Sequence, residues 1–334
     1  MLSQQTNLNL VLIDNEEQID QKKFQFFPGR IPDLRVVLMI PSSVDFFKSI
    51  GLWKKLDEKL IKKLTGIQVY ETSGSSFVHL DCKQNNLDEY LNYSIEIGHV
   101  TQRLQGMLDF PNNKKVKLLK TTLTLDKFSI DQNENYSYLN IRDNEDELKI
   151  RSKLIVASDG ANSAVRNKLK LNTFGHSYHE TGLVSTFRGN VVSHTSYQRF
   201  LHNGIFALLP LYDDYFSIVC SMSKNINENL ISLDSESFVK FVNKVLHNPS
   251  INDFSHFDRL DSTNNFVQPP VILEELCQRK TFPLHSQYVS NSVSNNIVLI
   301  GDAAHVVHPM AGQGLNLGIS DASLLGDTII EYNI

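Results

Sequence analysis

The sequence contains few cysteines and no long hydrophobic run. Its three cysteines, Cys82, Cys220 and Cys277, are odd in number and far apart in 334 residues, so they support neither a disulfide framework nor a zinc site. They indicate a reducing compartment. The longest apolar stretches, such as residues 10–13 and 297–300, are much shorter than the roughly 20 residues that cross a bilayer. The composition therefore argues against a disulfide-rich secreted domain and against a transmembrane protein.

An excess of positive charge is also absent. Lysine and arginine number 32 against 37 acidic residues, for a formal net charge of -5, so binding to a nucleic-acid backbone is not expected. The first residues contain no basic amphipathic or apolar leader, and neither a transit nor a secretory peptide is visible. The 11 histidines are scattered without ligand spacing, so no metal site is predicted.

The pattern of hydrophobic residues differs between the ends and the middle of the chain. Helical and strand periods alternate at both ends: residues 7–14 read as a short buried strand, and a helix is expected from Trp53 towards Leu64. Residues 176–222 are rich in strand-forming residues and turns, which is typical of an antiparallel sheet. This arrangement predicts a nucleotide-binding domain interrupted by a sheet domain.

The strongest motif covers residues 296–318. A buried apolar strand at 297–300 delivers Gly301 and Asp302 to its carboxyl end, where open α/β sheets bind their ligands. Glycine allows a ligand to approach the backbone, and the carboxylate of Asp302 can accept hydrogen bonds from sugar-like hydroxyls. The alternative for this strand end alone is an ordinary glycine turn between a strand and a helix.

The same motif continues into a helix that begins near Gly312, after a turn at His308-Pro309. The first turn of a helix presents free N–H groups and the positive end of its dipole, which favours an anionic ligand. Gly312 and Gly314 would allow close contact at this helix start.

A second motif covers residues 154–166. Here too an apolar strand ends in aspartate and glycine, at Asp159 and Gly160, and a helix opens between Ser163 and Arg166. Asp159 could hold a ribose or cap this helix, and Arg166 could reach a pyrophosphate or pair with a carboxylate. Two such strand ends about 140 residues apart, one in each residue order, favour a shared cofactor site.

These two motifs resemble the Asp-Gly and Gly-Asp fingerprints of the class A flavoprotein monooxygenases, the family of p-hydroxybenzoate hydroxylase. Residues 33–53 are similar to the family's segment in which an arginine touches FAD, here Arg35. Residues 198–211 are similar to the substrate-domain strands of the ubiquinone-biosynthesis branch, in particular its eukaryotic mitochondrial members that hydroxylate the C5 ring position. For Gln198 and Arg199 an ordinary surface strand remains the alternative.

The resemblance implies an α/β (α+β) fold, with a Rossmann-like FAD-binding domain and an inserted, mainly antiparallel β-sheet substrate domain. Residues 1–66, 93–170 and 281–334 would form the discontinuous FAD-binding domain, and residues 67–92 and 171–280 the substrate domain. The cofactor-binding residues carried over from the family are Asp14, Arg35, Asp159, Gly160, Arg166, Gly301, Asp302, Pro309, Gly312, Gly314, Leu315 and Asn316. No catalytic residue is assigned. His305 and His308 are expected to pack within the cofactor loop, with proton transfer as the alternative role.

The activity implied by the resemblance is an FAD-dependent monooxygenase reaction, which uses O2 to hydroxylate the ring of a polyprenylated 4-hydroxybenzoate-type intermediate of ubiquinone biosynthesis. Electrons would come from ferredoxin and its reductase. The protein would be peripheral to the matrix side of the mitochondrial inner membrane, together with other ubiquinone-biosynthesis proteins. Two alternatives stay open: a related flavin hydroxylase of another phenol, and a non-catalytic interaction protein.

The sequence also departs from the family pattern. The family's first strand, Gly-x-Gly-x-x-Gly turn and helix are missing ahead of residues 10–14, although Asp14 matches the carboxylate that bonds the adenosine ribose. The C-terminus is short as well, so a fragment of a longer protein is expected, with a parallel sheet that lacks its central strand. At Ile97 the family usually has an asparagine or glutamine near the flavin.

Overall fold

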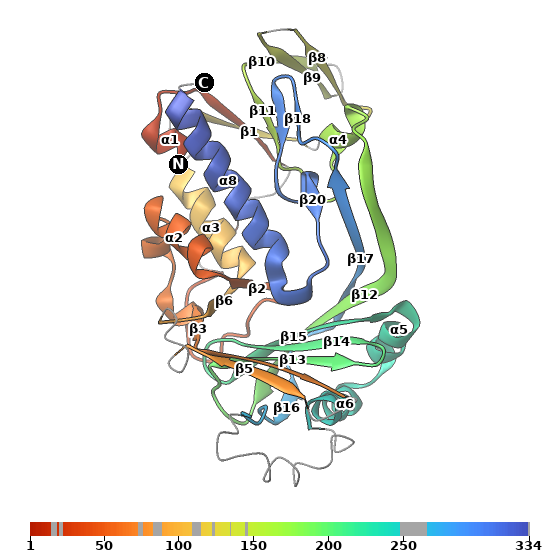
Figure 1. Ribbon diagram of the computed structural model, residues 1–334. Helices are drawn as coiled ribbons and strands as arrows, with labels where there is room; N and C mark the ends of the chain where they lie inside the picture. The colour runs from red at the N-terminus through yellow and green to blue at the C-terminus, as the bar shows by residue number, and fades with distance from the viewer. Residues whose placement is uncertain are drawn as a thin grey trace. The chain divides into compact units, whose positions relative to one another are not determined.

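The computed structural model describes residues 1–14, 19, 23–72, 76–82, 89–108, 115–121, 124–133, 135–143, 146–247 and 266–332. They divide into two compact units. The first unit comprises residues 1–19, 104–177 and 285–334, and the second comprises residues 20–103 and 178–284. Three elements continue from one unit into the other, namely α3 (Ile97–Leu108), β12 (Thr173–Gly189) and β17 (Lys280–Val289) (Figure 1).

The first unit contains two pairs of parallel strands in separate sheets. One pair is β1 (Leu10–Asp14) with β7 (Val116–Lys120), and the other is β11 (Ile155–Ala157) with β19 (Ile297–Leu299), to which β18 (Val293–Ser294) adds an antiparallel edge. Among the described residues, no strand joins the two pairs.

The prediction that residues 7–14 form a buried strand is only half correct. The strand exists as β1, but Val11 is 43% exposed and Leu12 is 39% exposed. A parallel strand is normally buried because it has neighbours on both edges and helices on both faces. Among the described residues β1 has one strand neighbour, β7, and its apolar side chains therefore stay partly in contact with solvent.

Several short elements accompany the strands of the first unit. They are the helices α1 (Leu2–Gln5) and α4 (Ala164–Lys168), the 3-10 turns η4 (Gly301–Ala303) and η5 (Met310–Gly312), and the two-residue strand β20 (His305–Val306). An antiparallel sheet of β8 (Phe128–Gln132), β9 (Ser137–Asp143) and β10 (Asp146–Ser152) packs Phe128, Leu139 and Ile141 into the same core as Ile297 and Leu299.

The long helix α8 (Gln313–Tyr332) completes the first unit and runs beside α1 (Figure 1). Its Gly326 lies against Met1, where an added Cβ would come within 2.6 Å of the Met1 sulfur. Within the described residues, no helix, α8 included, is both long and apolar enough to pass through a membrane.

The second unit is built on most of a nine-stranded sheet. The strand order is β20-β17-β12-β15-β14-β13-β4-β5, with β16 on β12. Its further strands are β4 (Gly66–Glu71), β5 (Phe77–Asp81), β13 (Thr195–Leu201), β14 (Gly204–Pro210), β15 (Tyr215–Ser223) and β16 (Ile272–Glu275). Neighbours β12 to β15, β15 to β14 and β14 to β13 are antiparallel, whereas β13 and β4 are parallel. The mainly antiparallel sheet is thus confirmed.

Helices α5 (Lys224–Ser232) and α6 (Ser235–His247) cover one face of this sheet. Side chains of α6 at spacings of three and four residues, such as Phe238, Val242 and Val245, pack against the buried strand residues Phe187 and Phe206. This spacing places them on one side of the helix. Burial of these apolar groups is the main term that holds both helices on the sheet.

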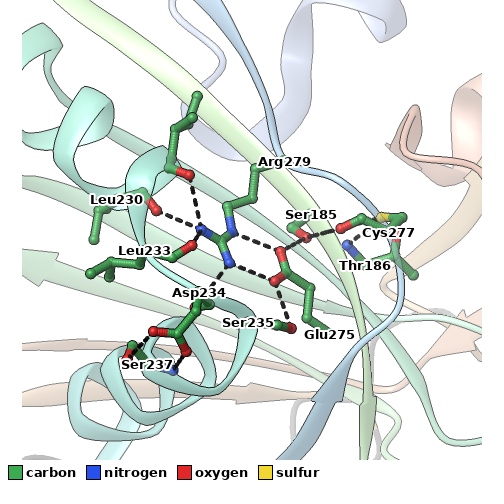
Figure 2. Close-up of polar contacts among 11 residues, drawn as sticks. Ser185, Thr186, Leu230, Leu233, Asp234, Ser235, Ser237, Glu275, Cys277 and Arg279 are labelled. Carbon is green, nitrogen blue, oxygen red and sulfur yellow. Dashed lines mark hydrogen bonds and ion pairs between the residues drawn. The ribbon is translucent and has the colours of Figure 1, made fainter.

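A buried ion pair fixes the junction between α5 and α6 (Figure 2). Arg279 Nε and Nη2 bind the two oxygens of Glu275 at 2.8 and 2.7 Å, while Arg279 Nη1 donates to the carbonyls of Leu230 and Leu233 at 2.7 and 2.6 Å. Ser185 of β12 donates to Glu275 at 2.9 Å. The guanidinium therefore satisfies carbonyls that the end of a helix leaves without partners.

A three-stranded sheet in the second unit corrects one sequence prediction. It consists of β2 (Val36–Met39), β6 (Asn92–Glu96) and β3 (Lys62–Leu64), with α2 (Pro41–Ser49) beside it. The helix expected from Trp53 towards Leu64 is wrong: the segment has two 3-10 turns, η1 (Trp53–Lys55) and η2 (Glu58–Leu60), followed by β3. Pairing of β3 with β6 provides hydrogen-bond partners for backbone N–H and C=O groups that would otherwise pair within a helix.

Candidate cofactor site

The two aspartate-glycine motifs lie at the same edge of one small sheet. Strands β11 and β19 are parallel neighbours, and the backbone N–H of Ile300 donates to the carbonyl of Ala157 at 3.0 Å. Because the carboxyl ends of parallel strands meet at one edge, the Asp159-Gly160 and Gly301-Asp302 turns are brought together. The sequence had led us to expect a shared cofactor site for the two motifs, and that site stays a prediction.

Asp159 caps helix α4. Its Oδ1 accepts a hydrogen bond from Ser163 Oγ at 2.6 Å and its Oδ2 accepts one from the Val165 N–H at 3.1 Å, while Ser163 Oγ accepts from the Arg166 N–H at 3.0 Å. Of the two roles considered for Asp159, capping is therefore present in the structure. Gly160 has a φ of +84° and open space where a Cβ would stand, so a ligand can approach its backbone. Contact of either residue with a cofactor stays a prediction.

Arg166 ties the two motifs to each other. Its Nη1 donates to the Ala303 carbonyl at 3.0 Å and its Nη2 to the Ala161 carbonyl at 2.6 Å. The side chain is buried, and this burial lowers the pKa of Arg166, an effect that the nearby Asp159 carboxylate partly offsets. The structure thus shows a link between loops, and the predicted contact of Arg166 with a cofactor stays a prediction.

Asp302 presents a carboxylate that has no protein partner among the residues that the structure describes. It is exposed and forms no hydrogen bond or ion pair with any residue in the described part of the chain. The preceding residue, Gly301, has a φ of +57°, and an added Cβ would meet only the Cα of Gly318, at 3.7 Å. A hydroxyl-rich ligand can therefore reach both the backbone of Gly301 and the carboxylate of Asp302.

Asp321 is a residue of this site that sequence reasoning missed. Its Oδ2 accepts a hydrogen bond from the Gly301 N–H at 2.8 Å and lies 2.6 Å from His305 Nε2. His305, expected only to pack in the loop, is therefore engaged with a carboxylate. One signal in the sequence could have revealed Asp321. It lies three residues after Gly318, so the two residues share the face of α8 that meets Gly301.

The start of α8 holds the other predicted residues of the first unit. Pro309 precedes η5, Gly312 has a φ of +63°, and α8 begins at Gln313. Asn316 is buried and its Nδ2 donates to the Gly312 carbonyl at 3.1 Å. Gly314 and the half-buried Leu315 lie in the first turn of α8, where helices leave backbone N–H groups for an anionic ligand.

Asp14 belongs to the first unit but to a different sheet. It ends β1 and stands opposite Lys120 of β7 in the parallel register. Its carbonyl accepts a hydrogen bond from the Thr121 N–H at 3.1 Å. The predicted contact of its carboxylate with a ribose stays a prediction.

Arg35 is the one predicted residue that belongs to the second unit. Its side chain is exposed, and its backbone is held by Asp33, whose Oδ1 accepts from the Arg35 N–H at 3.1 Å. Asp33 is held in turn by Glu96 Oε2, which accepts from the Asp33 N–H at 2.6 Å. Glu96 also forms a buried two-point ion pair with Arg30, at 2.6 and 2.9 Å. The segment before Arg35 is therefore rigidly anchored.

The first-unit residues fit a flavin nucleotide. Gly160 and Gly301 leave space next to the backbone, Asp302 offers an acceptor for the hydroxyls of a ribityl or ribose group, and the start of α8 suits the negatively charged ring of a reduced flavin. By contrast, the described residues contain no cluster of side chains that could hold a metal ion.

Comparison with known proteins identifies relatives of this chain. A family model described as an FAD binding domain matches residues 29–332. The ubiquinone biosynthesis monooxygenase COQ6, mitochondrial, of Dictyostelium discoideum is 27% identical over 98% of this chain and 72% of its own length. The proteins of the same name from Drosophila melanogaster and Caenorhabditis elegans are 31% and 30% identical, over 88% and 92% of this chain.

The chain spans 64% of the length of the Drosophila relative and 71% of that of the Caenorhabditis relative. Among solved structures, p-nitrophenol 4-monooxygenase PnpA from Pseudomonas putida has a TM-score of 0.66 and 16% identity, over 98% of this chain and 75% of its own. A probable FAD-dependent monooxygenase from Pseudomonas aeruginosa, PqsL, also scores 0.66, with 18% identity over 96% and 85%. At these identities the structures establish a shared fold.

Proposed function

Because this chain belongs to the FAD-binding family of flavoprotein monooxygenases, we propose that it hydroxylates the aromatic ring of a polyprenylated 4-hydroxybenzoate-type intermediate in ubiquinone biosynthesis. The observation that carries the proposal is the Gly301-Asp302 turn, which packs against Gly318 of α8 and in which Asp302 has no partner among the described residues. The names of the relatives, which are ubiquinone biosynthesis monooxygenases, support the choice of pathway.

FAD is the cofactor of this family and, when bound, supplies the chemistry that activates O2 for transfer of one oxygen atom. The chain's own residues bind and orient it. Asp302 accepts hydrogen bonds from cofactor hydroxyls, and Gly160, Gly301 and Gly314 admit the cofactor close to the backbone. The first turn of α8 lowers the energy of negative charge on the flavin ring.

The face of the second-unit sheet that lies away from α5 and α6 carries an exposed aromatic side chain suited to contact with a prenylated phenol. In β13, Tyr197 and Arg199 are buried on the helix side, whereas Phe200 on the alternate face is 39% exposed. Successive side chains of a strand point to opposite faces, so the face away from α5 and α6 carries this aromatic ring. An aromatic side chain of this kind can pack against a substrate ring or a prenyl tail.

We extend the proposal to location and electron supply. The relatives carry the word mitochondrial in their names, which supports a mitochondrial protein. The proposed position, peripheral to the matrix side of the inner membrane, rests on the resemblance to the ubiquinone-biosynthesis branch. Ferredoxin and its reductase are the proposed electron source, and other ubiquinone-biosynthesis proteins are the proposed partners. Both assignments rest on the resemblance to the ubiquinone-biosynthesis branch.

The first experiment is cofactor binding. The purified 334-residue chain is incubated with FAD, passed through a gel-filtration column, and its visible spectrum recorded. Retention of flavin absorbance with the folded protein peak is the expected result. Colourless, folded protein would contradict FAD binding by this chain.

The second experiment tests the substrate. The FAD bound to the chain is reduced chemically, and the chain is then mixed with O2 and either a prenylated or an unprenylated 4-hydroxybenzoate. Products are identified by mass spectrometry. We expect ring hydroxylation of the prenylated compound. Preference for the small unprenylated acid would instead assign the chain to a related hydroxylase of another phenol.

A further inference from the structure

Asp321 of α8 is the hydrogen-bond acceptor that connects this helix to the Gly301-Asp302 turn. We propose that Asp321 is a positioning residue, which closes the 301–305 segment so that the Asp302 carboxylate is held ready for FAD. The inference rests on the proposed FAD site and assigns a role there to a residue that does not itself touch the cofactor.

The geometry at Asp321 is specific. One oxygen, Oδ2, accepts from the Gly301 N–H at 2.8 Å and lies 2.6 Å from His305 Nε2. Both ends of the five-residue 301–305 segment are therefore bound to a single atom. One turn earlier on α8, Gly318 packs so tightly that an added Cβ would stand 3.3 Å from the Cα of Gly301. The helix and the strand end are thus in direct contact.

The middle of the segment is held as well. The Ala304 N–H donates to the Gly301 carbonyl at 2.8 Å, and the Ala303 carbonyl accepts from Arg166 Nη1 at 3.0 Å. The Asp302 carboxylate forms no hydrogen bond or ion pair with another described residue. A short loop closed in this way leaves one functional group free while its backbone is ordered in advance, so less conformational entropy is lost when a ligand binds.

Asp321 also determines the state of His305. A carboxylate is only an acceptor, so Nε2 of His305 must carry the proton that points at Asp321. In the neutral ring, Nδ1 is then the unprotonated nitrogen, and this atom is buried with no hydrogen-bond partner in the described part of the chain. His305 further pairs with Tyr288 through β20 and β17. The ring is therefore fixed in one orientation and one tautomer, which anchors the far end of the segment.

The test compares Asp321→Ala with Asp327→Ala. Asp327 lies on the same helix, is exposed, and has no partner among the described residues, so it controls for loss of an aspartate from α8. We expect Asp321→Ala to raise the dissociation constant for FAD, measured by flavin fluorescence, about tenfold or more, since two hydrogen bonds to a charged group are lost. Asp327→Ala should leave it within twofold of the original chain.

Two further readouts need no FAD. In the free chain, 15N spectra of histidine should show His305 as the Nε2-protonated tautomer, and Asp321→Ala should convert it to a mixture. Hydrogen exchange at the Gly301 amide should accelerate in the same variant. Because these measurements are made on the free protein, they decide the role of Asp321 even if the chain binds no FAD and the proposed function fails.

A conservative variant separates positioning from general stability. The side-chain amide of Gln can donate to Asp321 from nearly the position of Nε2, so His305→Gln should retain FAD affinity better than His305→Ala. Three results would overturn the proposal: equal FAD affinity in Asp321→Ala and the original chain, unchanged exchange at Gly301, or faster exchange throughout the chain with unchanged affinity. The last of these would assign Asp321 to stability alone.

Discussion

At the scale of single residues, two aspartates with similar sequence surroundings have different environments. Both carboxylate oxygens of Asp159 accept hydrogen bonds within the α4 cap, whereas Asp302 has no protein partner in the described part of the chain. A residue whose hydrogen-bonding capacity is already used supports the fold, and one whose capacity is free can bind a ligand. The two substitutions should therefore have separable effects.

We predict that Asp302→Ala weakens FAD binding about tenfold with little change in the free energy of unfolding. Asp159→Ala should instead lower the free energy of unfolding by about 1 kcal/mol, the usual effect of removing a helix cap. Fluorescence titration with FAD and urea denaturation of both variants measure the two quantities. A large loss of stability in Asp302→Ala would show that this carboxylate has a structural partner.

His99 provides a prediction about pH. It is fully buried, stacks on Phe24 with ring centroids 6.2 Å apart, and accepts a hydrogen bond at Nε2 from the Asp57 N–H at 3.1 Å. Burial, aided by the positive charge of Arg103, lowers the pKa of His99 from 6.5 to about 4. The folded state therefore holds the neutral ring.

The sign of the effect follows from proton uptake. Between pH 6.5 and about 4, the unfolded chain binds a proton at His99 that the folded chain does not, so stability falls as pH falls through this window. The contribution is at most about 3 kcal/mol. We expect His99→Gln to flatten the dependence of the unfolding free energy on pH in that range. The control is His194→Gln, because His194 is exposed. Equal slopes in the two variants would contradict the assignment.

At the scale of secondary-structure elements, the Glu275–Arg279 ion pair connects two helices and a strand. It connects the end of α5, the start of α6 through Ser235, and β12 through Ser185 (Figure 2). Both charged side chains are only 6 to 7% exposed. Removal of one partner would leave a buried charge and several carbonyls without compensation, which costs more than loss of a surface pair.

We predict that Arg279→Met lowers the free energy of unfolding by about 3–5 kcal/mol. Glu236 and Lys240 supply a matched control, since they form a pair with the same four-residue spacing but side chains 73 to 79% exposed. Lys240→Met should have no measurable effect. Chemical denaturation of the two variants makes the comparison, and similar losses in both would contradict the role of burial.

At the scale of the whole molecule, FAD binding should act on the two compact units differently. Eleven of the twelve predicted cofactor residues belong to the first unit and only Arg35 to the second. A ligand that binds the folded state stabilises it by mass action, by about 2.7 kcal/mol at 100 times its dissociation constant. Local protection from hydrogen exchange then reports which segments take part.

We predict that FAD slows exchange in residues 155–166 and 301–316, and that it also slows exchange in residues 33–40 if Arg35 binds the cofactor. Arg35→Gln should abolish the effect on residues 33–40 while it preserves protection in the first unit. Exchange followed by mass spectrometry resolves these peptides. Protection of residues 33–40 that persists in Arg35→Gln would remove Arg35 from the predicted site.

Local sequence determined much of this protein. The strand ends at Asp159 and Gly301, the Ser163 cap of α4 and the start of α8 next to Gly312 all depend on neighbouring residues, because capping and glycine conformation act over a few positions. The mainly antiparallel sheet follows from hydrophobic period and turn residues in the same way. Sequence similarity supplied the family and with it the expectation of FAD.

Tertiary structure decided the remainder. Asp321 meets Gly301 from 20 residues away and Arg166 meets Ala303 from 137 residues away, and no local rule predicts such partners. Residues 62–64 form a strand because they pair with β6, although their hydrophobic pattern favoured a helix. Long-range hydrogen bonds form only when the fold brings their groups together, so the arrangement that presents Asp302 became visible only in three dimensions.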